Sequence, residues 1–175
     1  MAQTSMVLVF LLFAASSYAT QGVELDSICK QAENPTFCLN LLNSKPGGVA
    51  GADLVDLANY ALDVARANIT TTTKLIKRLI RRNVNDTEAR DHYRLCLNQI
   101  HKGALNKVEF TQMTLNSGDY QSLNVAASGI RTHIELCIDG ESPSDTPYND
   151  TSLLPTYANV ISQVVDIILI ISNNL

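Results

Sequence analysis

The sequence predicts an all-α protein, an up-down-up-down four-helix bundle with an N-terminal disulfide-stapled helical hairpin. Three observations lead to this prediction. Beyond the first 19 residues, the chain has few strand signals and few glycines. Apolar side chains recur at steps of three and four over four long stretches. Four cysteines are present, and the first two enclose only eight residues.

The N-terminal residues 1–19 predict a signal peptide. The apolar run "MVLVFLLFAA" is followed by small residues at a cleavage position. A membrane anchor is the alternative, but about ten apolar residues are too few, since a span needs about 20. We therefore expect a mature domain over 20–175, with the hairpin at 24–46, the bundle at 53–175 and no membrane contact after cleavage.

Charge and cysteine content narrow the class of protein. With 13 basic and 17 acidic residues the chain is mildly acidic, which disfavours nucleic-acid binding and is compatible with docking on a basic protein surface. Secretion exposes cysteines to oxidation, so four of them predict disulfides. Neither zinc-type spacing nor a CxxC redox motif occurs, and no metal or cofactor is expected. Four cysteines allow three pairings, among which spacing alone does not choose.

The first two bundle helices follow from their caps and periodicity. The first is expected from about Asp53, its N-cap, to Asn83, after the Pro/Gly-rich break "SKPGGVAGAD". The second begins near Asp86 and ends at Gly118. The expected buried positions of the first are Leu57, Ala61, Val64, Leu75 and Leu79, and those of the second are Tyr93, Leu97, Ile100, Ala104 and Leu115.

The third and fourth helices complete the bundle. The third is expected from about Tyr120 to Ile138, before the break "DGESPSDTPYND". The fourth has the most regular seam, with apolar residues at Leu154, Tyr157, Ile161, Val164, Ile168, Ile171 and Leu175. Polar residues interrupt this last helix well below spanning length, which favours a buried helix over a membrane span.

The sequence does not predict an enzyme. His92 and His101 are nine residues apart on one helix and point in opposite directions, and His133 belongs to another helix. Ordinary surface or boundary histidines are the preferred interpretation. Neither a G-x-S-x-G nor an H-E-x-x-H motif occurs, and disulfide-bonded cysteines offer no thiol nucleophile.

Two surface features remain open. A basic stripe lies at the end of the first bundle helix, comprising Lys74, Lys77, Arg78, Arg81 and Arg82. It fits either a solvated helix end or a docking site for an acidic partner or a polyanion, and we favour the former. Of three glycosylation sequons, Asn85 and Asn149 fall in interhelical breaks and are the expected acceptors, whereas Asn68 is expected to point into the bundle and bond a neighbouring helix.

Together, the Cys-x8-Cys hairpin, the four amphipathic helices and the late cysteine pair resemble the plant invertase and pectin methylesterase inhibitor family. The strings "ICKQAENPTFCLNLL", "SGDYQSLNVAASGI" and "DIILIISNNL" are most similar to its pectin methylesterase inhibitor branch. The chain departs from the family's frequent residues at Ala32, Ile100 and Glu141. The resemblance implies the disulfide pairs Cys29–Cys38 and Cys96–Cys137.

The resemblance also implies a function: a secreted, apoplastic inhibitor that binds pectin methylesterase one-to-one without covalent chemistry and covers its substrate cleft. The alternative is inhibition of acid invertase, although the Pro-Lys-Phe motif of many invertase inhibitors is absent. A non-inhibitory four-helix ligand or carrier is a third class. The outer faces of the second and third helices are the expected contact surface, with Arg94, Asn98, Thr111 and Gln112 as candidates.

Overall fold

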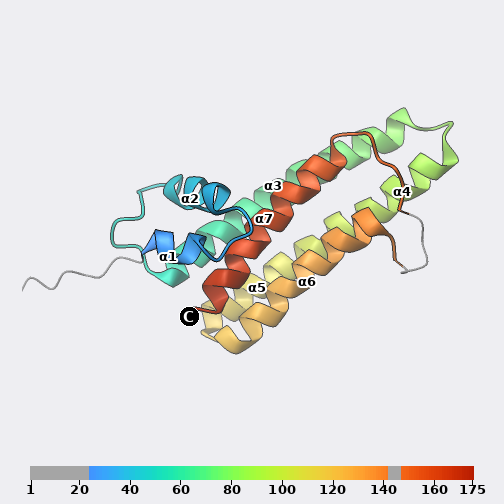
Figure 1. Ribbon diagram of the computed structural model, residues 1–175. Helices are drawn as coiled ribbons and strands as arrows, with labels where there is room; N and C mark the ends of the chain where they lie inside the picture. The colour runs from blue at the N-terminus through green and yellow to red at the C-terminus, as the bar shows by residue number, and fades with distance from the viewer. Residues whose placement is uncertain (1–23, 142–146) are drawn as a thin grey trace, which may run out of the picture.

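The computed structural model describes residues 24–141 and 147–175, so the predicted signal peptide lies outside the described residues. The chain forms a four-helix bundle with a small helical hairpin at one end (Figure 1). The hairpin contains α1 (Leu25–Cys29) and α2 (Pro35–Asn43). The bundle contains α3 (Leu54–Arg82), the continuous rod of α4 (Thr87–Leu97), η1 (Asn98–Ala104) and α5 (Leu105–Ser117), then α6 (Tyr120–Asp139) and α7 (Leu154–Ser172).

Three of the bundle helices begin at an aspartate that caps the helix. The side chains of Asp53, Asp86 and Asp119 each accept a hydrogen bond from the backbone N–H three residues later, at 2.8, 3.0 and 3.1 Å. Such caps satisfy a backbone donor that the first turn of a helix leaves without a partner. Gly118 ends α5 with a φ of 71°, in the left-handed region that glycine tolerates. The predicted N-cap Asp53 and helix end Gly118 are confirmed.

The sequence predicts one regular α-helix over the rod formed by α4, η1 and α5, and the structure differs from this prediction. Residues Asn98–Ala104 form a π-helical segment, in which the turns are wider than in an α-helix. Its buried residues include Ile100 and Ala104, which still lie on the predicted inner face. The wide turn also brings Gly103 against the ring of His133 on α6. The π-helical segment thus coincides with a close contact between η1 and α6, which local periodicity does not encode.

Burial of the side chains confirms the predicted inner face of α7, whereas the observed inner face of α3 is rotated relative to the predicted one. Five seam residues of α7 are fully buried, and Tyr157 and Leu175 are half-buried. On α3, Val64 and Leu75 are only half-buried, because Ala58, Leu62 and Ala65 also take up the inner face. By length and composition α7 could cross a membrane, but half of its most apolar window is buried inside the bundle.

The structure forms both disulfides that the resemblance implies. Cys29–Cys38 joins α1 to α2, with Cα atoms 5.4 Å apart, and Cys96–Cys137 joins α4 to α6, with Cα atoms 4.4 Å apart. All four cysteines are used, so no thiol is free.

Polar bonds dock the hairpin onto α7. The N–H of Glu33 donates to Asp166 Oδ2 at 3.2 Å, and Asn34 Nδ2 donates to Gln163 Oε1 at 2.9 Å. Asp166 also pairs with Arg131 of α6 at 3.1 Å. The same carboxylate thus connects the hairpin, α6 and α7.

Candidate partner-binding surface

The four predicted contact residues differ in their exposure. Arg94 and Asn98 are exposed, and Arg94 pairs with the equally exposed Asp91 at 3.4 Å, a contact that contributes little to stability. Gln112 is half-buried and donates to Asn59 of α3 at 2.6 Å. Arg94 and Asn98 are therefore available to a partner, whereas the side chain of Gln112 is partly committed inside the molecule.

Thr111 was predicted on an outer face, and this prediction is wrong. Its side chain is fully buried. It lies between Val108 and Leu115 on the inner face of α5, and its hydroxyl donates to the carbonyl of Lys107 at 2.7 Å. Because its own helix satisfies the hydroxyl, a polar residue can occupy this core position. Thr111 therefore makes no contact with a partner.

The outer face of α5 carries two large apolar side chains that the sequence interpretation missed. Phe110 is 49% exposed and Met113 is 67% exposed, and their spacing of three puts them on one face. The sequence could have identified them, because both are large apolar residues that lie outside the buried seam of Ala104, Val108 and Leu115. Exposed aromatic and methionine side chains on a rigid helix are typical of protein-binding surfaces.

The neighbouring helix α6 adds one more exposed large apolar side chain, Val125. The Lys107 ammonium lies 5.9 Å from the centre of the Phe110 ring, and the Lys107 stem runs against α6 at Gly129. A Cβ added to Gly129 would lie 3.0 Å from Lys107 Cδ, so the missing side chain makes room for the lysine. On α6, Val125 is 74% exposed. We name Phe110, Met113 and Val125 the α5–α6 face.

A polar joint connects α6 to η1, several turns away from this surface along both helices. His133 Nδ1 lies 2.7 Å from Gln99 Oε1, and Gln99 Nε2 donates to Glu141 Oε1 at 2.8 Å. Since the amide NH₂ of Gln99 is the donor to Glu141, its oxygen is left to accept from His133 Nδ1–H. Burial lowers the pKa of His133, and the nearby Lys107 lowers it further. Glu141, one of the departures from the family pattern, therefore takes part in the joint.

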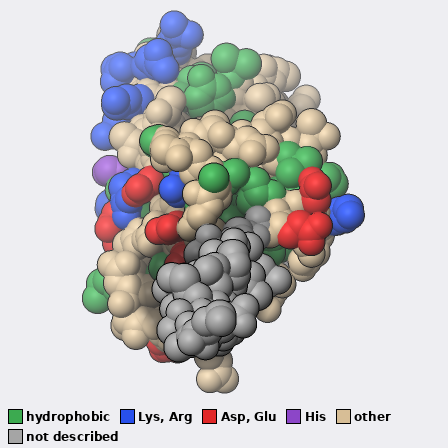
Figure 2. Space-filling view, turned by 90° about the vertical axis from the view of Figure 1, so that its left-hand side faces the viewer, with side chains coloured by type: hydrophobic (Ala, Val, Ile, Leu, Met, Phe, Trp, Pro, Cys, Tyr) green, Lys and Arg blue, Asp and Glu red, His purple; other side chains and the backbone are tan. Residues whose placement is uncertain are grey.

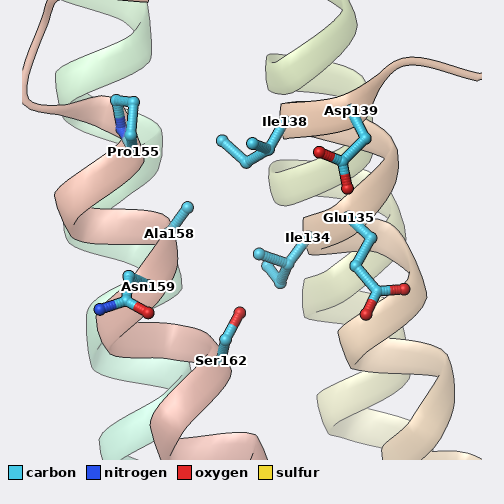
Figure 3. A pocket seen from close by; sticks show the side chains of 8 residues that line it. All are labelled: Ile134, Glu135, Ile138, Asp139, Pro155, Ala158, Asn159 and Ser162. Carbon is cyan, nitrogen blue, oxygen red and sulfur yellow. The ribbon is translucent and has the colours of Figure 1, made fainter. Parts of the chain in front are cut away.

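A shallow groove separates α6 from α7 (Figure 3). Ile134, Ile138 and Ala158 give it apolar walls, and Glu135 and Asp139 stand one turn apart along the α6 side. Its volume is about 200 Å³. An apolar groove with an acidic edge can accept a side chain that has an apolar stem and a cationic end.

A second joint fastens the segment before α7 to α4. His92 Nε2 lies 3.5 Å from Asp150 Oδ2, and the two side chains are 7% and 4% exposed. Tyr93 donates its hydroxyl to Asp150 Oδ1 at 3.0 Å, and the Tyr148 ring lies 4.6 Å from that of His92. Burial lowers the pKa of His92 against the opposing effect of Asp150, and burial raises the pKa of Tyr93 to about 12.

Burial distinguishes the three histidines from one another and locates two of the residues that depart from the family pattern. His92 is buried, which corrects its interpretation as a surface or boundary residue, whereas His101 is exposed and His133 half-buried. Ala32 and Ile100 are buried, so both side chains contribute to the packing of the core. The described residues contain no group of three His, Cys, Asp or Glu side chains placed to hold a metal ion.

The sequon asparagines are also placed. Asn85 and Asn149 are both exposed, in the α3–α4 connection and before α7. Asn68 is half-buried, but its amide donates to Val64 of its own helix at 2.9 Å. The predicted bond from Asn68 to a neighbouring helix is therefore wrong, since the preceding turn of α3 offers a nearer carbonyl.

Comparison with known proteins places this architecture in a family. The model of the plant invertase/pectin methylesterase inhibitor family matches residues 24–171. Pectinesterase inhibitor 1 of Arabidopsis thaliana is 34% identical over 132 residues, 75% of this chain and 72% of that protein. The pectinesterase inhibitor of Actinidia deliciosa is 29% identical over 153 residues, 85% of this chain and 77% of that protein.

Solved structures agree with the sequence relatives. The crystal structure of a mutant form of a pectin methylesterase inhibitor from Arabidopsis superimposes with a TM-score of 0.73 at 29% identity, covering 87% of this chain and 97% of that one. A second Arabidopsis pectin methylesterase inhibitor structure gives a TM-score of 0.61 at the same identity. The chain belongs to the plant invertase/pectin methylesterase inhibitor family, in its pectin methylesterase inhibitor branch.

Proposed function

We propose that this protein is a secreted, non-enzymatic inhibitor of plant pectin methylesterase, which binds the enzyme one-to-one and covers its substrate cleft. The observation that carries the proposal is the match to proteins named as pectinesterase inhibitors over about three quarters or more of both chains. The mechanism is non-covalent, which fits a chain whose four cysteines are all in disulfides.

We assign the contact to the α5–α6 face, together with the exposed Arg94 and Asn98 of the same rod. This face offers large apolar side chains on packed helices that are tied by the Cys96–Cys137 disulfide and the His133–Gln99 joint. A surface that is already rigid loses little conformational entropy when it docks. Apolar and aromatic groups are also those that dominate binding energy at protein interfaces.

The function is tested by titrating a plant pectin methylesterase and a plant acid invertase in parallel with the oxidised protein. We expect stoichiometric loss of the esterase activity alone, and light scattering of the mixture should give the mass of a one-to-one complex. Loss of invertase activity alone would replace the proposal with the invertase alternative. If neither enzyme responds to the folded protein, the proposal fails.

The contact surface is tested with a double variant, Phe110→Ser/Met113→Ser. Loss of two exposed apolar contacts should raise the inhibition constant at least tenfold, since residues central to an interface contribute more than 1 kcal/mol each. Val84→Ser is the matched control, because Val84 is 57% exposed but lies in the connection between α3 and α4. Equal inhibition by the double variant and the parent would place the contact elsewhere.

Secretion into the apoplast and glycosylation complete the proposal. We propose cleavage of residues 1–19 and glycans on the exposed Asn85 and Asn149. Expression through a plant secretory pathway, followed by mass spectrometry, should give an N-terminus at Thr20 and modified peptides at both asparagines. An intact N-terminus on protein recovered from the medium would contradict the predicted cleavage.

A further inference from the structure

The end of α3 carries a concentration of positive charge that neither the fold nor the α5–α6 face explains. Five of the 13 cationic residues of the chain fall within nine positions. All five side chains are exposed, and they lie on the side of α3 opposite its buried residues Thr72, Ile76 and Leu79. We call this set the basic stripe: Lys74, Lys77, Arg78, Arg81 and Arg82. Figure 2 shows Lys and Arg side chains gathered at the upper end of the molecule, the end at which α3 finishes in Figure 1.

The helix dipole accounts for only part of the stripe. Cations near a helix C-terminus are favoured, but the effect is confined to the last turn. That turn contains Arg81 and Arg82. Lys74, Lys77 and Arg78 lie one to two turns earlier, beyond its reach. Moreover, like charges spaced four apart, such as Lys74 and Arg78, repel each other and weaken the helix.

Among the residues that the structure describes, no carboxylate forms an ion pair with the stripe. The ion pairs found among the described residues involve Arg66, Arg94, Arg131 and His92, and none includes a cation of the stripe. This is notable in a chain whose formal net charge is −4. In the described part of the chain, positive charge is therefore concentrated at the end of α3, although acidic residues outnumber basic ones in the sequence.

The shape of the stripe favours an extended polyanion over a folded protein. At 1.5 Å per residue, the five cations form a row about 12 Å long on one helix. Lys74, Lys77, Arg78 and Arg81 border a shallow depression that is open to solvent. The apolar residues of the same stretch, such as Leu75 and Leu79, are turned inward, so the row lacks the apolar centre that protein interfaces usually have.

We propose that the basic stripe binds de-esterified pectin, a linear polyuronate, separately from the enzyme-binding face. The choice of polyanion rests on the proposed function, because a pectin methylesterase converts neutral methyl esters of pectin into carboxylates. The cations would pair with successive carboxylates, and the carbon stems that line the depression would pack against the sugar rings. The inhibitor would thereby be retained where the esterase has already acted.

The test measures binding to polygalacturonate by isothermal titration calorimetry, without any enzyme. Lys74→Gln/Lys77→Gln removes two stripe charges, and Lys30→Gln/Lys102→Gln is the matched control with the same net charge and exposed positions. We expect the stripe variant to bind about three- to tenfold more weakly and the control to bind like the parent. Binding by the parent should weaken steeply between about 0.02 M and about 0.5 M salt.

Three outcomes of the binding measurements would overturn the proposal. Equal weakening in the two double variants would mean that net charge alone attracts the polymer. Equal binding of fully methylesterified pectin would mean that carboxylates are not recognised. Polyglutamate that binds as tightly, with the same dependence on Lys74 and Lys77, would assign the stripe to an acidic protein partner.

The same variants separate this proposal from the proposed function. Full inhibition of pectin methylesterase by Lys74→Gln/Lys77→Gln, together with weakened polygalacturonate binding, would show two independent surfaces and support the proposal. If inhibition weakens in parallel with polymer binding, the stripe is part of the enzyme contact. This result would overturn the proposal of a separate polymer-binding surface. Failure of the parent to inhibit the enzyme would overturn the proposed function, while the enzyme-free titration would still test the stripe.

Discussion

The two helices of the hairpin have five and nine residues, whereas α3 and α7 of the bundle have 29 and 19. Helices as short as α1 and α2 are not stable alone in water, because their few hydrogen bonds do not offset the cost of nucleation. The hairpin is held by a disulfide and by polar bonds to α7. The bundle buries a continuous apolar core. The hairpin is therefore ordered by its disulfide and its hydrogen bonds to α7, whereas the bundle is ordered by burial of apolar surface.

The largest effect should follow from removing the bundle disulfide. In Cys96→Ala/Cys137→Ala we expect the free energy of unfolding to fall by about 4 kcal/mol, because the crosslink closes a long loop in the unfolded chain. Urea denaturation followed by far-ultraviolet circular dichroism measures this change. The loss should be global, with hydrogen exchange accelerated throughout α3–α7. Exchange that accelerates only around the two cysteines would contradict a cooperative bundle.

Removing the hairpin disulfide should have a smaller and local effect. For Cys29→Ala/Cys38→Ala the shorter loop predicts a loss of about 2.5–3 kcal/mol. We expect faster hydrogen exchange over 25–43, while the exchange of α3–α7 remains that of the parent, since the core is untouched. If the bundle loses protection to the same extent as the hairpin, the proposed independence of the two regions is wrong.

A methyl group at Gly103 tests the tight contact between η1 and α6. A Cβ there would overlap the His133 ring, so the ring would move and its bond to Gln99 would break. Gly103→Ala should cost about 1–3 kcal/mol of unfolding free energy, in spite of the better helix propensity of alanine. Gly129→Ala is the control: its Cβ meets only the flexible stem of Lys107, and we expect a change within about 0.5 kcal/mol. Equal stabilities for the two variants in urea titrations would refute the contrast.

The carboxylate of Asp166, which connects the hairpin to the bundle, should contribute about 1 kcal/mol to the free energy of unfolding. Asp166→Asn removes the charge that pairs with Arg131, whose side chain is 31% exposed, and weakens acceptance from the Glu33 N–H. Thermal unfolding should record the loss, and hydrogen exchange should rise first at 30–36. Asp63→Asn is the control, since Asp63 is 70% exposed and its pair with Arg66 should contribute less than about 0.5 kcal/mol. An unchanged hairpin in Asp166→Asn would show that the disulfide alone holds it.

The smallest effect concerns pH. Burial lowers the pKa of His92 in the fold below its ordinary value of about 6.5, although Asp150 opposes the shift, and Tyr93 and Tyr148 pack around the ring. The unfolded chain therefore binds the proton more readily. The corresponding stability is fully present above about pH 6.5 and declines as pH falls toward the lower, native pKa. His133 acts in the same direction.

This pH dependence is measured by urea titrations at pH 7.5 and 5.5. The parent should be less stable at pH 5.5 than at pH 7.5, and His92→Gln should reduce the difference between the two pH values. His133→Gln should reduce it as well. A difference of the same size in the parent and in His92→Gln would contradict the assigned role of the buried histidine.

Much of the fold could be predicted from local signals. Aspartate N-caps and Gly118 act within a few residues of sequence, and the predicted limits of the first three bundle helices agree with the structure to within one or two positions. The seam predicted for α7 extends to Leu175, three residues past the end of the helix at Ser172. The candidate contact surface was harder to predict. Thr111 was assigned to the outside although its hydroxyl is satisfied within α5, and Phe110 and Met113 were overlooked although they lie outside the seam.

By itself, the sequence determined the helical class, the helix limits and the apolar seams, because these depend on side-chain periodicity and backbone capping along the chain. Tertiary structure alone decided the π-helical turn beside His133, the burial of the His92–Asp150 pair and the docking of the hairpin through Asp166. Each of these three features joins residues that lie far apart along the chain. Their energies depend on contact distance and exclusion of water, which arise only when the helices pack together.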